Sequence, residues 1–101
     1  MKEKGLQKTV LNEVFEYLKE IKAVDTESEF STDWLGRSEC YMRSLRFKRT
    51  QASIGTLAIC ASKLQHYGHR LKAKQEHSNI SAKLLLLSEA CNKQIRNVID
   101  A

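Results

Sequence analysis

Apolar residues recur at steps of three and four along most of this 101-residue chain, which is the period of an amphipathic helix. The clearest stripe lies between positions 4 and 23, where charged residues fill the opposite face. Its members are Leu6, Val10, Leu11, Val14, Phe15, Leu18 and Ile21. No stretch alternates apolar and polar residues over the length of a strand. The pattern predicts an all-α fold of about five helices, beginning with one over residues 4–23.

The segment that follows is polar, and residues 25–30 are interpreted as a loop whose last residue, Phe30, enters the core. Ser31 is predicted to cap a short helix that stops at Gly36, since serine side chains cap helix starts and glycine accepts a positive φ. Trp34 precedes this turn and is interpreted as a structural anchor.

A second short helix is predicted after the turn, capped by Ser38 and running from residue 39 to residue 49. Turning by about 100° per residue, it would bury Met42 and Leu45 and leave its basic residues in solvent.

Two long helices are predicted in the rest of the chain, over residues 53–76 and 80–99, with Ser53 capping the first. The second contains four consecutive leucines at 84–87 and is apolar on more than one face. A hairpin with the preceding helix covers one face, and a second subunit would cover the other. We therefore expect a homodimer, with Leu84, Leu87, Cys91 and Ile95 at its interface.

The length indicates one domain over residues 1–101. Within it, the turn at Gly36 and the caps at Ser38 and Ser53 outline a helix-turn-helix-like part at 31–64, which is followed by a C-terminal helical hairpin at 65–101. The net charge is +5, and its distribution is uneven. Residues 34–77 carry nine Lys and Arg against two acids, whereas residues 1–33 carry five Lys against eight acids. Basic charge concentrated in one part of the chain is typical of a phosphate-binding surface, and the alternative is a solvated basic face.

The stretch WLGRSECYMRSLRFKRTQASIGTLAICASKL, residues 34–64, resembles the helix-turn-helix of the phage-repressor (Cro/C1-type) family. In that family a Gly and a capping Ser precede the recognition helix, and a Pro-Ser pair precedes the next helix. Gly36 and Ser38 take the first places here, and Ala52 and Ser53 take the second. The sequence departs from the family's pattern where Thr32 replaces a small Ala, Ser31 an apolar residue, Lys48 the closing Gly and Ala52 the Pro. The chain is also loosely similar to short bacterial helical proteins, which adds no function.

The resemblance implies a small transcriptional regulator that binds double-stranded DNA, with residues 39–49 as the recognition helix. It implies a base-facing set made of Glu39, Cys40, Arg43 and Ser44. Arg43 has the fork that contacts guanine O6 and N7, and Glu39 can accept from cytosine N4. Phosphate contacts, which position a protein without specifying sequence, would come from Arg37, Ser38, Arg46, Lys48 and Arg49.

No cofactor, metal or enzymatic activity is expected. The three histidines lack clustered Cys or acids at ligand spacing, and no nucleophile, phosphate-loop or CxxC motif occurs. Three widely spaced cysteines are typical of reduced side chains in a cytoplasmic protein, and the N-terminal segment lacks the apolar region of a signal peptide. The alternative to a DNA-binding regulator is a non-enzymatic helical interaction module, such as an adaptor or an antagonist of a regulator.

Overall fold

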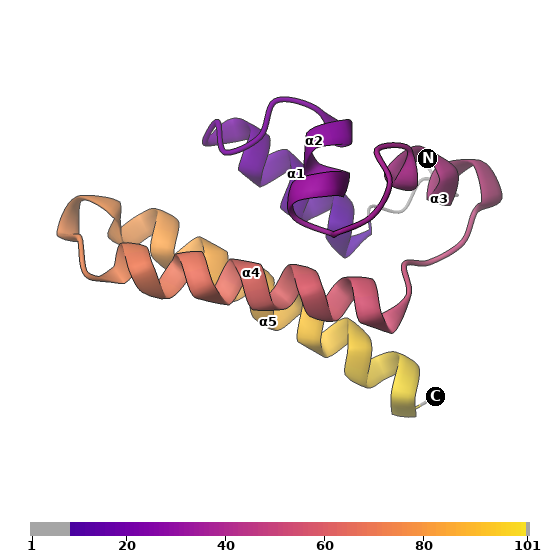
Figure 1. Ribbon diagram of the computed structural model, residues 1–101. Coiled ribbons are helices and arrows are strands. Elements are labelled where there is room, and N and C mark those ends of the chain that lie inside the picture. Colours follow the sequence, from indigo (N-terminus) through magenta and orange to yellow (C-terminus); the bar gives the residue numbers. More distant parts are fainter. Residues whose placement is uncertain (1–8, 101) are drawn as a thin grey trace, which may run out of the picture.

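The computed structural model describes residues 9–100, and within that range every regular element is helical, which confirms the predicted all-α fold. Figure 1 shows two layers: a long antiparallel hairpin below, and three shorter helices lying across one side of it. The elements are α1 (Val10–Glu20), α2 (Glu27–Asp33), α3 (Tyr41–Lys48), α4 (Ile54–Lys72), the 3-10 turn η1 (Gln75–His77) and α5 (Ser78–Asp100).

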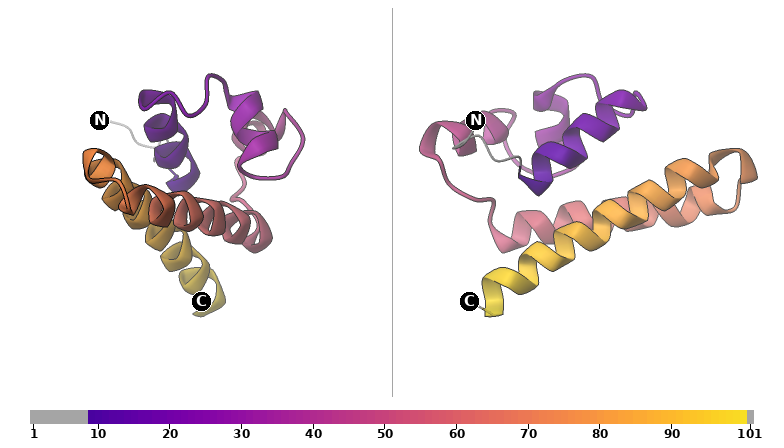
Figure 2. Two further views of the ribbon diagram at one scale, coloured as in Figure 1. Left: turned by 60° about the vertical axis from the view of Figure 1, so that its left-hand side comes forward. Right: turned by 180° about the vertical axis from the view of Figure 1, so that it is seen from behind.

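The hairpin of α4 and α5 is drawn close by small and hydroxyl-bearing residues. The hydroxyl of Ser81 donates to the carbonyl of Gly68 at 2.7 Å, and that of Ser88 donates to the carbonyl of Ala61 at 2.8 Å. A methyl group on Gly68 would lie 2.7 Å from Leu85 Cδ2, so glycine is what permits this approach. Towards the C-terminal end of α5 the two helices diverge (Figure 2).

One core joins the two layers. Phe30, Leu35 and Leu64 are fully buried, and the ring of Phe30 lies 5.6 Å from that of Phe15. The prediction that Phe30 enters the core is confirmed. Trp34 is also buried and packs against Tyr67 of α4 at 5.2 Å, in agreement with its interpretation as an anchor.

The first helix is shorter than the predicted range of 4–23. Thr9 is its N-cap and accepts a hydrogen bond from the Asn12 amide, so the helix begins at Val10. Lys22 has a φ of 65° after its end. The part of the prediction that covers residues 4–8, including Leu6, lies outside the described residues.

Prediction of residues 25–30 as a loop was wrong, because α2 begins inside this segment. The Thr26 hydroxyl accepts from the Glu29 amide at 3.1 Å, and the Glu29 carboxylate accepts from the Asp25 amide at 2.7 Å. A Thr followed three residues later by Glu is the spacing of a capping box, so the sequence did contain the signal. Ser31 is therefore a buried residue in the middle of α2 and not its cap.

Two of the three remaining cap predictions are confirmed. Gly36 adopts a φ of 65° in the turn after α2, and the Ser53 hydroxyl accepts from the Thr56 amide at the start of α4. Ser38 is different: its carbonyl, not its hydroxyl, accepts from the Tyr41 amide, and α3 begins at Tyr41 without a side-chain cap.

None of the helices in residues 9–100 is long and apolar enough to cross a membrane.

Candidate nucleic-acid interface

α3 is fixed to the rest of the protein along one side only. Met42 is buried, and Tyr41 and Leu45 are half-buried against the core. The Tyr41 hydroxyl donates to the Thr56 hydroxyl at 3.3 Å and accepts from the Ser53 amide at 3.4 Å. These bonds tie the start of α3 to the start of α4 and leave the opposite face of α3 in solvent, at one end of the molecule (Figure 1).

The predicted base-facing residues lie on that free side, although two of them precede the helix. Glu39 and Cys40 form the turn before α3, while Arg43 and Ser44 belong to its first turn. Glu39 and Arg43 are exposed, whereas Cys40 and Ser44 are half-buried. The structure brings two of the four together, since an Arg43 guanidinium nitrogen lies 3.0 Å from the Cys40 sulfur.

Four of the five residues predicted to grip phosphates are exposed and form no ion pair among the described residues: Arg37, Ser38, Lys48 and Arg49. The Arg37 guanidinium lies over the Tyr41 ring, 4.9 Å from its centroid. Arg49 ends α3 in the left-handed region, with a φ of 55°. The residue that takes the role of the closing glycine is thus Arg49, one position after the Lys48 assigned from the sequence.

Arg46 differs from the other four because its charge is already engaged. Its two terminal nitrogens contact the two carboxylate oxygens of Glu27 at 2.5 and 3.0 Å, a bidentate pair between α3 and α2. The hydrogen bond to Glu27 raises the pKa of Arg46. Glu27 lies 19 residues away and belongs to the segment predicted to be a loop, so sequence spacing did not indicate this pair. Arg46 is better described as a residue that orients α3.

Phe47 was not among the predicted site residues, yet its side chain is 88% exposed. It lies four residues after Arg43, and residues four apart share one face of a helix. At about 100° per residue, that face is opposite the one that carries Met42 and Leu45. The signal available in the sequence was the helical angle itself, which places Phe47 with Arg43 and Cys40.

Charge is segregated over the described residues. From Thr9 to Asp33 the chain carries two Lys and seven acids, all of them on α1, α2 and the links that follow them. From residue 37 to residue 49 it carries five basic residues and one acid. The basic part is the exposed face of α3 and its flanks, so an approaching polyanion meets attraction at this end and repulsion at α1 and α2.

The residues expected at a dimer interface lie mostly in the hydrophobic core of the single chain. Leu84, Leu87 and Cys91 are buried, and Ile95 is half-buried against the same core. Their apolar surface is used by the fold of a single chain, which accounts for the run of leucines except at Leu86, whose side chain is 67% exposed. Homodimer formation stays a prediction, and these side chains are not a free surface for it.

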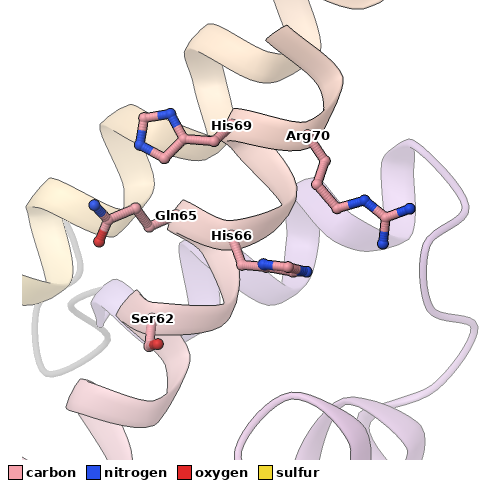
Figure 3. Close-up of a pocket in the computed structure, with 5 residues that line it drawn as sticks. All are labelled: Ser62, Gln65, His66, His69 and Arg70. Carbon is pink, nitrogen blue, oxygen red and sulfur yellow. The ribbon is translucent and has the colours of Figure 1, made fainter. Parts of the chain in front are cut away.

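Two surface pockets elsewhere lack the features of a ligand-binding site. One is lined only by side chains of α4, as Figure 3 shows, so no second element closes it; the residues are Ser62, Gln65, His66, His69 and Arg70. The other lies between the end of α2 and α4, where Lys63 donates to the Asp33 carbonyl and Thr32 to helix carbonyls. No group of His, Cys, Asp and Glu that could hold a metal occurs in the part of the chain that the structure describes.

Comparison with known proteins identifies a family. Residues 11–101 match DUF6626, a family of unknown function, and the chain belongs to it. No curated protein and no solved structure matches the chain.

Proposed function

We propose that this member of DUF6626 is a small DNA-binding regulator that docks the free face of α3 in the major groove. One observation carries the proposal: α3 is packed on one side through Met42, and its other side and both flanks are basic and exposed. An α-helix fits the width of the major groove, where each base pair presents a distinct pattern of donors and acceptors.

Two kinds of contact follow from this placement. Arg43 is exposed on the free face, where its guanidinium can contact guanine O6 and N7 once it leaves the Cys40 sulfur. Lys48 and Arg49 lie at the end of the helix and are placed to contact phosphates. Arg46 contributes less than its charge suggests, because Glu27 neutralises it.

The test compares Lys48→Ala with Arg43→Ala on duplex DNA selected from a random pool. Lys48→Ala should weaken binding to every sequence alike and lower the salt slope by roughly 0.9, the value for one lost phosphate contact. Arg43→Ala should cost on the order of 1–3 kcal/mol on the selected site and little elsewhere, because a base contact is lost. Equilibrium titrations at several salt concentrations measure both effects.

Lys93→Ala is the matched control, since Lys93 is an exposed lysine on α5, which belongs to the other layer of the fold (Figure 1). It should leave both affinity and salt slope unchanged. Absence of duplex binding by the wild-type chain would refute the proposal. Equal losses of affinity for Arg43→Ala and Lys48→Ala on all sequences would also refute it, because they would indicate a basic surface that does not recognise base sequence.

A non-enzymatic interaction module is the second candidate. One observation favours it: Leu86 and Ile99 of α5 are 67% and 66% exposed, so apolar side chains of this helix are available for a contact with another protein. A chain that binds no DNA but forms a complex with another regulatory protein, sensitive to Leu86→Ser, would support this candidate.

A further inference from the structure

Phe47 is the most exposed of the large apolar side chains in the described part of the chain. Leaving a phenylalanine in water forgoes about 1.5–3 kcal/mol of burial free energy. The side chain contributes nothing to the core, and the face on which it lies is the one opposite Met42. The ring is therefore available for a contact outside the fold.

The surroundings of Phe47 favour a nucleic acid over a protein as its partner. Its neighbours in the chain are Arg46, Lys48 and Arg49, and Arg43 shares its face. The other exposed large apolar residues are on α4 and α5 and not on α3: Ile54, Ile59, Tyr67, Leu86, Val98 and Ile99. Residues 37–49 carry five basic residues and one acid, so the surface around this single aromatic ring attracts a polyanion.

We propose that Phe47 is a specificity-determining residue that contacts the C5-methyl group of a thymine in the major groove. This inference rests on the proposed docking of α3. Thymine is the base that presents a methyl group in that groove, and apolar side chains are its usual contacts. In the proposed docking Lys48 and Arg49 contact phosphates, Arg43 contacts a guanine and Arg46 is paired with Glu27, so the ring can reach the base edge without leaving a charge unpaired.

The spacing between Phe47 and Arg43 adds a geometric requirement. Four residues advance about 6 Å along a helix axis, and successive bases on a strand are about 3.4 Å apart. The thymine read by Phe47 should consequently lie within about two base pairs of the guanine read by Arg43. A preferred site should contain both bases at that separation.

The experiment uses the full chain and duplexes selected from a random pool, with each thymine of the selected site replaced in turn by deoxyuridine. That replacement removes only the methyl group. At one position the wild-type affinity should fall about fourfold, the value for one buried methyl-sized group. Phe47→Ala should weaken binding to the thymine site and bind the thymine and uracil forms of that position equally. Leu86→Ala, which trims another exposed apolar side chain, on α5, should keep the wild-type discrimination.

The outcomes separate this inference from the proposed function. If the wild-type chain selects no site, both fail. If it selects a site and loses affinity with Arg43→Ala, the proposed DNA binding stands. In that case the inference about Phe47 is wrong if Phe47→Ala binds like the wild type, or if this variant keeps the fourfold preference for thymine over uracil. A selected site with no thymine within two base pairs of the guanine also overturns it. Because Phe47 lies outside the core, its variant should fold, and circular dichroism checks this.

Discussion

Buried hydroxyl groups show how one residue type stabilises or destabilises this fold according to what it meets. Ser81 and Ser88 of α5 are buried, and each donates to a carbonyl of α4. Ser31 of α2 is fully buried, and its hydroxyl has no hydrogen-bond partner among the described residues. A buried polar group without a partner loses its hydration and gains nothing in return.

Ser31→Ala should therefore preserve or raise the free energy of unfolding, by up to about 2 kcal/mol, because it removes an unpaired hydroxyl. Ser88→Ala should lower it by about 0.5–1.5 kcal/mol, because one buried hydrogen bond, from that hydroxyl to the Ala61 carbonyl, is lost. Urea titrations followed by circular dichroism measure both. A loss of more than about 1 kcal/mol in Ser31→Ala would show that the hydroxyl is hydrogen-bonded after all.

The packing of α4 against α5 requires the two backbones to come close, and this requirement outweighs helix propensity at one glycine of α4. Gly55 and Gly68 both belong to α4, and glycine costs about 1 kcal/mol relative to alanine inside a helix. A Cβ on Gly55 would meet nothing within 4 Å, whereas one on Gly68 would lie 2.7 and 2.9 Å from two carbons of Leu85. The same residue is thus replaceable at one position and required at the other.

Gly55→Ala should raise the free energy of unfolding by up to about 0.5 kcal/mol, because Gly55 is in open space but lies in the first turn, where the gain is smaller than in mid-helix. Gly68→Ala should lower it by about 1–2 kcal/mol, because the overpacking at Leu85 exceeds the propensity gain. Thermal unfolding of the two variants should shift the midpoint in opposite directions. Equal stabilisation by both would mean that α5 can move away without loss of packing.

For the whole molecule, the decisive feature is that one chain completes its own core. Leu87 is buried in the core, while Leu86 beside it faces solvent. The expectation of a dimer held by Leu84, Leu87, Cys91 and Ile95 required those side chains to be free. A dimer that uses α5 would have to form through the exposed side of that helix.

Leu87→Glu should unfold the chain and not merely separate subunits, because an unpaired charge would be placed in the core. Leu86→Glu is the matched variant and should leave the fold intact. Circular dichroism reports the fold, and light scattering reports the mass. If Leu87→Glu stays folded while its mass halves, the dimer interface is the one expected from the sequence, and the packing described above is not the one in solution.

The sequence by itself determined the helical class, the number of helices, the turn at Gly36, the cap at Ser53 and the place of the basic segment. These features depend on local spacing and local backbone conformation, which are visible along the chain. The start of α2 was also visible, in the Thr26–Glu29 spacing, and was assigned wrongly to Ser31.

Only the tertiary structure decided which charged side chains are unpaired and which apolar side chains are exposed to solvent. Arg46 is neutralised by Glu27 because α2 packs beside α3, and Leu87 is covered because α4, α5 and the upper layer share one core. Phe47 stays in solvent because nothing in the described chain packs on the outer face of α3. The helical period shows which residues share a face of a helix. Whether that face is buried depends on segments distant in the sequence, and their positions are set only by tertiary packing.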